Sequence, residues 1–213
     1  MYFIKTPWWL KKIYNKYLWD IPTKDKNLYL TFDDGPHPVA TCFALDTLQR
    51  YNAKATFFCI GKNVLLYPEI YNRIEFEKHA IGNHTHNHYN GWKTNNTEYL
   101  NNIGRAAEVI KSNLYRPPYG RIKHSQGKAL QSLGYHIIMW DVLSGDFDRT
   151  LSRENCLKNV TEKATTGSII VFHDSEKAYN NMSYALPHVL DYFSTKGFRF
   201  NRIEPPYNKT GPE

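Results

Sequence analysis

Aspartate and histidine, the residue types that hold divalent metals and move protons, gather at a few places along this chain of 213 residues. Asp33 and Asp34 are adjacent and open an Asp-Asp-Gly-Pro segment, while His84 and His88 are four residues apart. Two imidazoles and one carboxylate would fill three positions around a zinc ion and leave the rest for water and substrate, as catalytic sites do. The neighbouring carboxylate could then act on that water.

Each of these motifs also has an ordinary structural explanation. Asp-Asp-Gly-Pro consists of turn-forming residues, and two histidines at this spacing are common on surfaces. If the chain turns helical there, His84 and His88 share one face, whereas His86 faces the other side and is not expected to be a ligand. The segment Arg116-Pro117-Pro118-Tyr119-Gly120 is a stiff proline turn, which could also hold an arginine and a backbone N–H in place for an oxyanion.

The elements that must position these residues alternate between apolar strands and helices. Strands are expected at 28–32, 55–60, 79–83, 135–142, 168–172 and 197–201. Helices are expected at 39–51, 63–76 with a break at Pro68, 97–114 with Thr97 as cap, 125–133, 152–164 with Ser152 as cap, and 182–195. This alternation indicates parallel βαβ units, arranged as a barrel or as an open doubly wound sheet.

Polar clusters directly follow four of the expected strands. They are Asp33-Asp34, His84 to His88, Asp146-Phe147-Asp148 and His173-Asp174. Because the C-terminal ends of parallel strands form one face, where active sites of α/β folds lie, we expect these clusters to converge.

The composition is typical of a soluble folded protein, with 41% hydrophobic and 22% charged residues. Three cysteines, none at CxxC spacing, indicate neither a disulfide framework nor a thiolate zinc site. No apolar stretch approaches the roughly 18 residues of a membrane span, and early lysines interrupt any signal-peptide core. We therefore expect a cytoplasmic or peripheral membrane protein. The net charge of +7 is spread along the chain without a nucleic-acid reader motif, so no nucleic-acid partner is expected.

The first 22 residues stand apart from the domain expected at 23–213. Apolar side chains recur there at three- and four-residue steps with lysines between them, which predicts a short amphipathic helix that begins after Pro7 and includes Trp8, Trp9, Leu10, Ile13, Tyr14, Tyr17, Leu18 and Trp19. We expect this segment to pack on the domain, because no linker separates the two. The alternative is a basic, Trp-rich segment that lies on a membrane surface.

In their order along the chain, the motifs resemble the five motifs of the polysaccharide deacetylases (NodB-homology domain, carbohydrate esterase family 4). The matching segments are Thr31 to Pro36, His84 to His88, Arg116 to Gly120, Asp146-Phe147 and Val171-Phe172-His173. The resemblance covers about residues 28 to 200. It implies an α/β fold, namely a distorted (β/α) barrel with about seven parallel strands, and a divalent metal, most commonly Zn²⁺, with Co²⁺, Ni²⁺ or Mn²⁺ as alternatives.

The resemblance also implies a role for each matching residue. Asp33 matches the general base, and Asp34, His84 and His88 match the metal ligands. The remaining matches are Arg116 as the partner of the base, the Tyr119 backbone N–H as oxyanion donor, His173 as general acid and Asp146 as the carboxylate that orients it. Phe147 and Val171 fall where the family usually has Trp and Leu around the acetyl methyl group, and with Tyr119 they are the expected substrate contacts. Both departures are apolar, so we expect a reshaped pocket.

The expected function is thus a metal-dependent hydrolase that removes N-acetyl groups from N-acetylhexosamine glycans, peptidoglycan-like or chitin-like, and acts as a monomer. Arg116 beside Asp33 should favour an ionised base, and Asp146 beside His173 should keep the acid protonated. Two alternatives remain: an O-acetyl esterase on xylan-like chains, and a non-catalytic module that binds glycan or a membrane surface.

Overall fold

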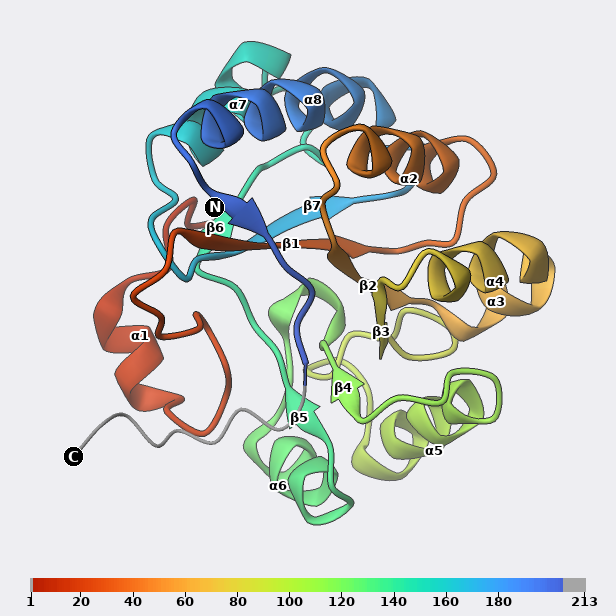
Figure 1. Cartoon of the computed structure of the whole chain (residues 1–213). Helices are drawn as coiled ribbons and strands as arrows, with labels where there is room; N and C mark the ends of the chain where they lie inside the picture. The colour runs from red at the N-terminus through yellow and green to blue at the C-terminus, as the bar shows by residue number, and fades with distance from the viewer. Residues whose placement is uncertain (1, 205–213) are drawn as a thin grey trace.

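A curled sheet of parallel strands forms the centre of the computed structural model, which describes residues 2–204 (Figure 1). Its strands are β1 Asn27–Asp33, β2 Ala55–Cys59, β3 Ala80–Asn83, β4 Leu114–Tyr115, β5 His136–Ile137, β6 Val142–Leu143, β7 Ile169–His173 and β8 Arg199–Phe200. They lie in the order β5-β4-β3-β2-β1-β7-β6, with β8 beside β1, and every pair is parallel. The predicted distorted α/β barrel with about seven parallel strands is confirmed.

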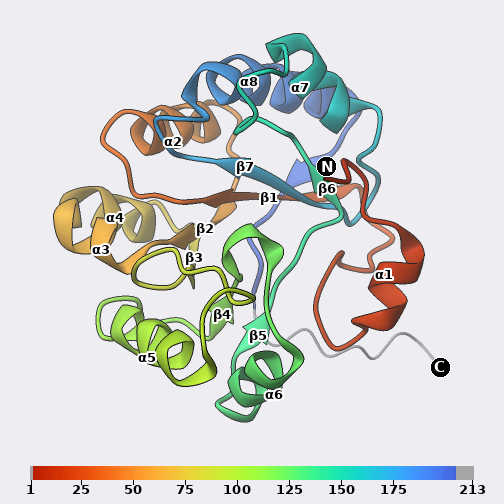
Figure 2. The ribbon, with the colours of Figure 1, turned by 180° about the vertical axis from the view of Figure 1, so that it is seen from behind.

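Burial on both faces explains why the central strands are continuously apolar. All seven residues of β1 are buried. Its outward side chains Leu28, Leu30 and Phe32 belong to the large core beneath the helices, whereas Tyr29 packs into a second cluster with Phe58 inside the barrel. The helices surround the strands, as the two opposite views show (Figure 1; Figure 2).

The helices are α1 Trp8–Ile13, α2 Ala40–Arg50, α3 Gly61–Leu66, α4 Pro68–Phe76, α5 Asn96–Ala107, α6 His124–Ser132, α7 Arg153–Thr161 and α8 Tyr179–Thr195, with a 3-10 turn η1 at Pro118–Gly120. The break at Pro68 and the Ser152 cap were predicted correctly, since Pro68 begins α4 and the Ser152 side chain accepts a hydrogen bond from the Asn155 N–H.

The predicted helix 97–114 is wrong at both ends. Asn95, not Thr97, is the cap, because its side chain accepts from the Glu98 N–H. The helix ends at Ala107, and the last residue assigned to it, Leu114, begins β4. Ser112 turns the chain into the sheet, as its hydroxyl donates to the Ile81 carbonyl and accepts from the Leu114 N–H.

The strand predicted at 135–142 is bent into two pieces, which lie at the two edges of the curled sheet. β5 pairs with β4, and β6 pairs with β7 on the opposite edge. At the bend, the carbonyl groups of Ile138 and Met139 accept hydrogen bonds from the guanidinium of Arg116, which is fully buried inside the barrel. A side chain therefore satisfies backbone groups at a bend where strand pairing cannot.

The N-terminal segment runs along this bent strand. Backbone hydrogen bonds join Thr6 to Asp141 and Leu143 to Ile4, and a further one joins Met139 to Leu18. Tyr17, Trp19 and Ile21 are buried. The helix itself is shorter than predicted: it ends at Ile13 rather than continuing to Trp19. No helix in the described range 2–204 is long and apolar enough to cross a membrane.

Arg116 gives the first prediction. Arg116→Met should destabilise the protein by about 3–5 kcal/mol, because it leaves the Asp33 carboxylate and two strand carbonyls buried without their partner. Urea denaturation measures the effect, with Arg121→Met at an exposed position of the following turn as the matched control. A change in Arg116→Met no larger than in the control would contradict this account of how the bend between β5 and β6 is stabilised.

Candidate active site

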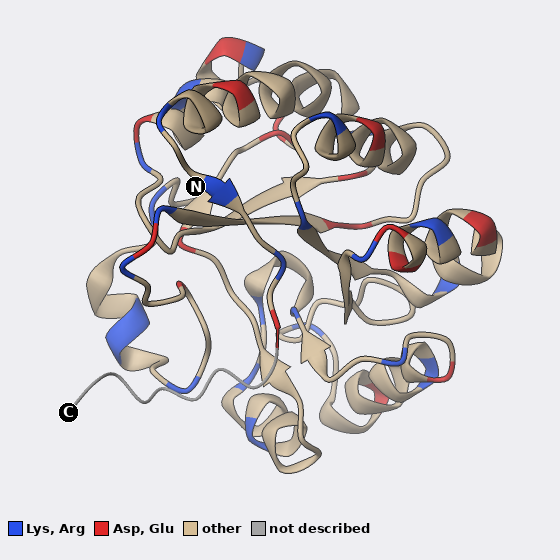
Figure 3. Cartoon of the chain, in the orientation of Figure 1, with Lys and Arg blue, Asp and Glu red and all other residues tan. Residues whose placement is uncertain are grey.

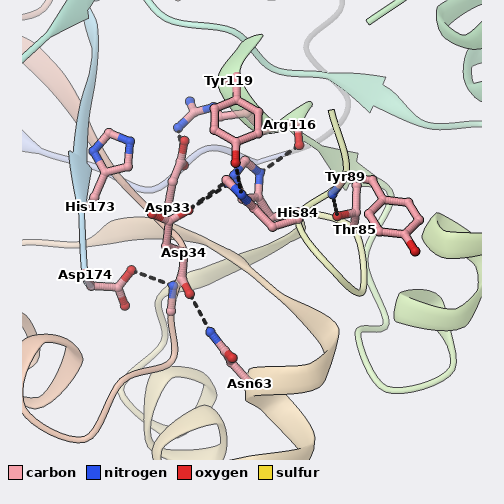
Figure 4. A network of polar contacts seen from close by, with 12 residues as sticks. Asp33, Asp34, Asn63, His84, Thr85, Tyr89, Arg116, Tyr119, His173 and Asp174 are labelled. Carbon is pink, nitrogen blue, oxygen red and sulfur yellow. Dashed lines mark hydrogen bonds and ion pairs between the residues drawn. The ribbon is translucent and has the colours of Figure 1, made fainter. Parts of the chain in front are cut away.

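The two aspartates at the end of β1 point in different directions. Asp33 is the last residue of the strand and pairs in register with His173 of β7. Asp34 has a φ of 84°, a left-handed conformation that non-glycine residues rarely adopt. This turn directs Asp33 towards Arg116 and Asp34 towards His84 (Figure 4). Backbone strain of this kind persists where the surrounding structure enforces it, typically at functional sites.

Asp33 forms a buried ion pair. Nη1 of Arg116 donates to its Oδ1 at 2.7 Å and to the Thr31 hydroxyl at 2.7 Å. The guanidinium also stacks over the Phe58 ring at 4.1 Å from the ring centre. Burial lowers the pKa of Arg116, and the charge of Asp33 opposes that change. Asp33 is thus held in one orientation by a cation that cannot move away.

Three side chains from two strand ends offer ligand atoms to one point. Nε2 of His88 lies 3.1 Å and Nε2 of His84 3.7 Å from Oδ1 of Asp34, and the three ligand atoms all lie within 4.8 Å of one another. Two ligands bound tetrahedrally to zinc at about 2.1 Å lie about 3.4 Å apart, so the spacing fits a single ion. Oδ1 of Asp34 is buried and is approached by the two imidazole nitrogens without a well-formed hydrogen bond, an arrangement that suits a cation held between the three groups.

Neighbouring groups orient both imidazoles for this task. Nδ1 of His84 lies 2.8 Å from the Arg116 carbonyl oxygen, so Nδ1 carries the proton and Nε2 keeps its lone pair. Nδ1 of His88 is 3.1 Å from the Tyr119 hydroxyl. Side chains of Asp34 and His88 remain 24% and 22% exposed, so water and substrate can reach the cluster.

A loop brings the histidines together, so the helical turn considered for this spacing does not form. Residues 84–90 contain no helix, and Thr85 and His88 have left-handed φ values of 64° and 58°. Two asparagines shape the loop: Asn83 accepts from the Thr85 N–H, and Asn102 of α5 accepts from two further backbone N–H groups. His86 lies outside the ligand cluster, as predicted, and its Nδ1 occupies the space beside Gly61.

The charge states of the cluster suit a cation. Burial raises the pKa of Asp34, but contact with His88 and the charge of His173 outweigh this and hold that pKa well below its usual range. Burial lowers the pKa of His84 to about 4, so the ring is neutral at pH 7. An ionised carboxylate and a neutral imidazole are the forms that bind metal.

On the other side of Asp33, His173 is paired with Asp146. Nδ1 of His173 donates to Oδ1 of Asp146 at 2.8 Å, and the His173 backbone N–H donates to Oδ2 at 2.6 Å. Burial by itself lowers the pKa of His173, but the Asp146 carboxylate, helped by Asp34 and Asp33, raises it to about 9. This imidazole is therefore protonated at pH 7, and it remains 16% exposed.

The expected substrate contacts lie around these groups. Phe147 packs edge-on against His173 with ring centres 5.1 Å apart, and Val171 is buried two residues before His173 on β7. Tyr119, with a left-handed φ of 61°, holds its exposed ring over His88. The structure thus gathers every predicted site residue at one end of the barrel.

Several supporting residues escaped the sequence reasoning. Asp174 is fully buried and accepts from the Gly35 N–H and the Thr41 hydroxyl, and a Cβ on Gly35 would lie only 2.0 Å from that carboxylate. Asn63 of α3 donates to the Asp34 carbonyl. Tyr2 packs on Phe147 at 5.1 Å and donates to Asp148 at 2.8 Å. Only Asp174 had a sequence signal, its place in a polar cluster after a strand.

Comparisons with known proteins agree with this geometry. A family model described as polysaccharide deacetylase matches residues 20–138. A peptidoglycan-N-acetylglucosamine deacetylase of Bacillus cereus is 36% identical over 199 residues, which cover 90% of this chain and 71% of that protein. A chitooligosaccharide deacetylase of Azorhizobium caulinodans is 32% identical over 161 residues, 72% of this chain and 76% of that protein.

A solved structure gives the same result in three dimensions. The peptidoglycan N-acetylglucosamine deacetylase Bc1960 superposes with a TM-score of 0.85 at 33% identity, and the match covers 93% of this chain and 95% of that one. The family, as a rule, depends on a metal. By sequence and by fold, this chain belongs to the polysaccharide deacetylase family and is an enzyme of that class.

Proposed function

We propose that this enzyme removes the N-acetyl group from N-acetylglucosamine units of peptidoglycan-type glycan, with Zn²⁺ as its metal. One observation carries the proposal: the Asp34, His84 and His88 cluster lies beside a buried Asp33–Arg116 pair, and a His173–Asp146 pair lies at the neighbouring strand end. A metal site, a base and an acid are the three parts that metal-assisted amide hydrolysis requires. The peptidoglycan preference rests on the relatives named above.

The residues present fit a divalent cation, and their chemistry favours zinc. Two imidazole nitrogens and one carboxylate oxygen, with open positions beside them, are the ligand set of catalytic zinc sites. When bound there, the ion would polarise the acetyl carbonyl and make water more acidic.

Asp33 is the proposed base. The ion pair with Arg116 and the register with His173 hold its carboxylate at the strand end, next to the ligand cluster. There it takes a proton from the attacking water. Because Arg116 also donates to Thr31 and to two strand carbonyls, the base cannot swing away between turnovers.

The proposed acid is His173, with the Tyr119 backbone N–H as oxyanion donor. An amine leaves as a neutral molecule only after a proton reaches its nitrogen, and an imidazolium with a pKa of about 9 carries that proton at pH 7. The turn at Pro118–Gly120 is closed by hydrogen bonds from Gly120 to Pro117 and from Arg121 to Pro118, which fix the backbone around Tyr119.

The pairing of His173 with Asp146 also helps to choose between amide hydrolysis and the two alternative functions. An ester releases an alcohol more easily than an amide releases an amine, so an O-acetyl esterase has less need of a strongly basic His173. A non-catalytic binding module needs no such pair at all. The paired acid and base therefore favour amide hydrolysis over both alternatives.

Acetate release tests the proposed function. The zinc-loaded enzyme is expected to release acetate from peptidoglycan, less from N-acetylated chitooligosaccharides, and least from acetylated xylan. Faster release from xylan would establish the esterase instead. If no acetate appears from any of the three while zinc is bound, the binding-module alternative replaces the proposal.

The His173–Asp146 pair predicts a specific pH dependence. The acid must be protonated, so kcat/KM falls as the pH rises through the pKa of His173. Asp146→Asn removes the carboxylate that raises this pKa, and the fall should move to lower pH by about one unit or more. Profiles of the two zinc-loaded enzymes, with Asp148→Asn as control on the same loop, measure the shift. If the fall of kcat/KM at high pH is unchanged in Asp146→Asn, His173 is not the acid.

A further inference from the structure

The largest concentration of exposed apolar side chains lies outside the active site. Among the described residues, six large exposed ones fall within the first fourteen: Tyr2, Phe3, Trp8, Trp9, Ile13 and Tyr14. Trp8 is 75% exposed, Ile13 64% and Trp9 46%. Isolated exposed apolar residues are ordinary, but a cluster of this kind marks a surface that contacts something. We refer to Trp8, Trp9, Ile13 and Tyr14, with Lys12 and Lys16, as the N-terminal patch.

Most apolar side chains of α1 face solvent, whereas those of an ordinary surface helix face the protein core. At 100° per residue, Trp8, Lys12, Trp9 and Ile13 share one broad face, and that face is exposed. Lys11 lies on the opposite side, where it bridges Asp20 and Asp141, and Asp141 is only 3% exposed. A helix whose only partner is its own domain turns apolar residues inward and lysines outward. Here Leu10 packs inward, but Trp8, Trp9 and Ile13 face outward.

This arrangement is held firmly in place. Lys5 also pairs with Asp141, and Thr6 and Leu18 form backbone hydrogen bonds with the bent strand. Tyr17 and Trp19 are buried behind the helix. The tryptophans therefore cannot turn inward without breaking buried ion pairs, and the patch is presented to the outside in a fixed position.

The charge of the patch selects its partner. Residues 2–19 contain no acidic side chain, and α1 carries only positive charge (Figure 3). Lys12 and Lys16 are exposed beside the tryptophans. Tryptophan between lysines is the composition of segments that lie in the headgroup region of a bilayer, where the ring is half in hydrocarbon and lysine meets anionic lipid.

We infer that the N-terminal patch docks this enzyme on an anionic lipid surface, with α1 parallel to the membrane. A second copy of the chain fits less well, because Lys12 and Lys16 would face their own counterparts. A neutral glycan could stack on the tryptophans but would give the lysines no partner. The segment begins beside the active site, since Tyr2 contacts Phe147, which contacts His173. α1 itself lies near the start of β7, since Lys11 pairs with Asp20 and Asp141, and both of these aspartates contact Ser168.

Vesicle flotation of the whole chain tests the inference. Binding is expected to vesicles of phosphatidylcholine with phosphatidylglycerol, to weaken with salt, and to be much weaker with phosphatidylcholine alone. The double variants Trp8→Ala/Trp9→Ala and Lys12→Glu/Lys16→Glu should each weaken binding by about tenfold or more. Matched controls are Phe76→Ala/Trp92→Ala, at exposed aromatic residues elsewhere, and Lys128→Glu/Lys158→Glu on α6 and α7; both should bind like the wild type.

Two further measurements test whether the patch variants damage the active site and whether the patch joins two copies of the chain. Acetate release from a soluble chitooligosaccharide should be the same in both patch variants and the wild type, because none of their residues belongs to the active site. Sedimentation velocity shows whether the wild type self-associates through the patch. No binding to anionic vesicles, equal loss in the control variants, or self-association abolished by Trp8→Ala/Trp9→Ala would each overturn the inference.

Discussion

Asp33→Asn is expected to lower kcat by about 10²- to 10⁴-fold, the usual contribution of a general base, while zinc binding persists. Asparagine has the shape of aspartate and can still accept the hydrogen bond from Arg116, but it cannot take a proton from water. The metal should stay, because Asp34 and the two histidines are untouched and their cluster is oriented by other groups. Single-turnover acetate release and zinc content, measured on the same sample, report both properties.

Controls separate loss of the base from loss of the fold. Asp33→Asn leaves the Arg116 charge buried without a counter-ion, so the variant should also be less stable and must be assayed well below its melting temperature. Asp148→Asn, an aspartate near the site that contacts Tyr2, should keep nearly full activity. His173→Ala should resemble Asp33→Asn: inactive, folded and loaded with zinc. If Asp33→Asn or His173→Ala keeps a near wild-type rate, the role assigned to that residue is wrong.

The second large effect concerns the metal. Chelation should reduce acetate release to background, and added Zn²⁺ should restore it. His88→Ala should weaken zinc affinity by more than about a hundredfold, since it removes one of three ligands, and Tyr119→Phe by roughly tenfold, since it removes only the hydroxyl beside Nδ1 of His88. Tyr119→Phe keeps the backbone N–H, so its zinc-saturated kcat should stay close to that of the wild type.

Competition with a zinc-sensitive dye measures these affinities. His124→Ala, at an exposed histidine on α6, is the matched control and should bind zinc like the wild type. The proposed ligand set fails if His88→Ala retains wild-type affinity, or if the chelated enzyme keeps its full rate.

The position of the chemistry along the fold could be predicted from the sequence. Asp33 and His173 end β1 and β7, His84 directly follows β3, and parallel strands bring their C-terminal ends together. That rule needs only strand order and direction. It located the site without any knowledge of the loops, and it holds here because β1, β3 and β7 are long enough to be recognised.

What the rule could not predict was the loop geometry. A helical turn between His84 and His88, one way to bring the two rings together, does not form; left-handed residues at Thr85 and His88 produce the same convergence. Such conformations depend on side chains far away in sequence, here Asn102 of α5, and no local pattern encodes them. The two-residue strands β4, β5 and β6 are likewise too short to show a periodicity.

The N-terminal segment shows a different limit. Its spacing indicated a helix after Pro7, which forms but ends at Ile13. Periodicity gives the faces of a helix and not which face turns inward. The deciding partner is Asp141, a buried carboxylate more than a hundred residues away, which draws Lys5 and Lys11 towards the domain. As a result, Trp8 and Trp9 face outward.

Anomalous diffraction at the zinc absorption edge tests the central claim most directly. In crystals of the zinc-loaded enzyme we expect one strong peak about 2.0–2.2 Å from Nε2 of His84, Nε2 of His88 and a carboxylate oxygen of Asp34, with Asp33 close by but not bound to the ion. A peak elsewhere, or zinc held by Asp33 in place of Asp34, would contradict the assignment of metal ligand and base.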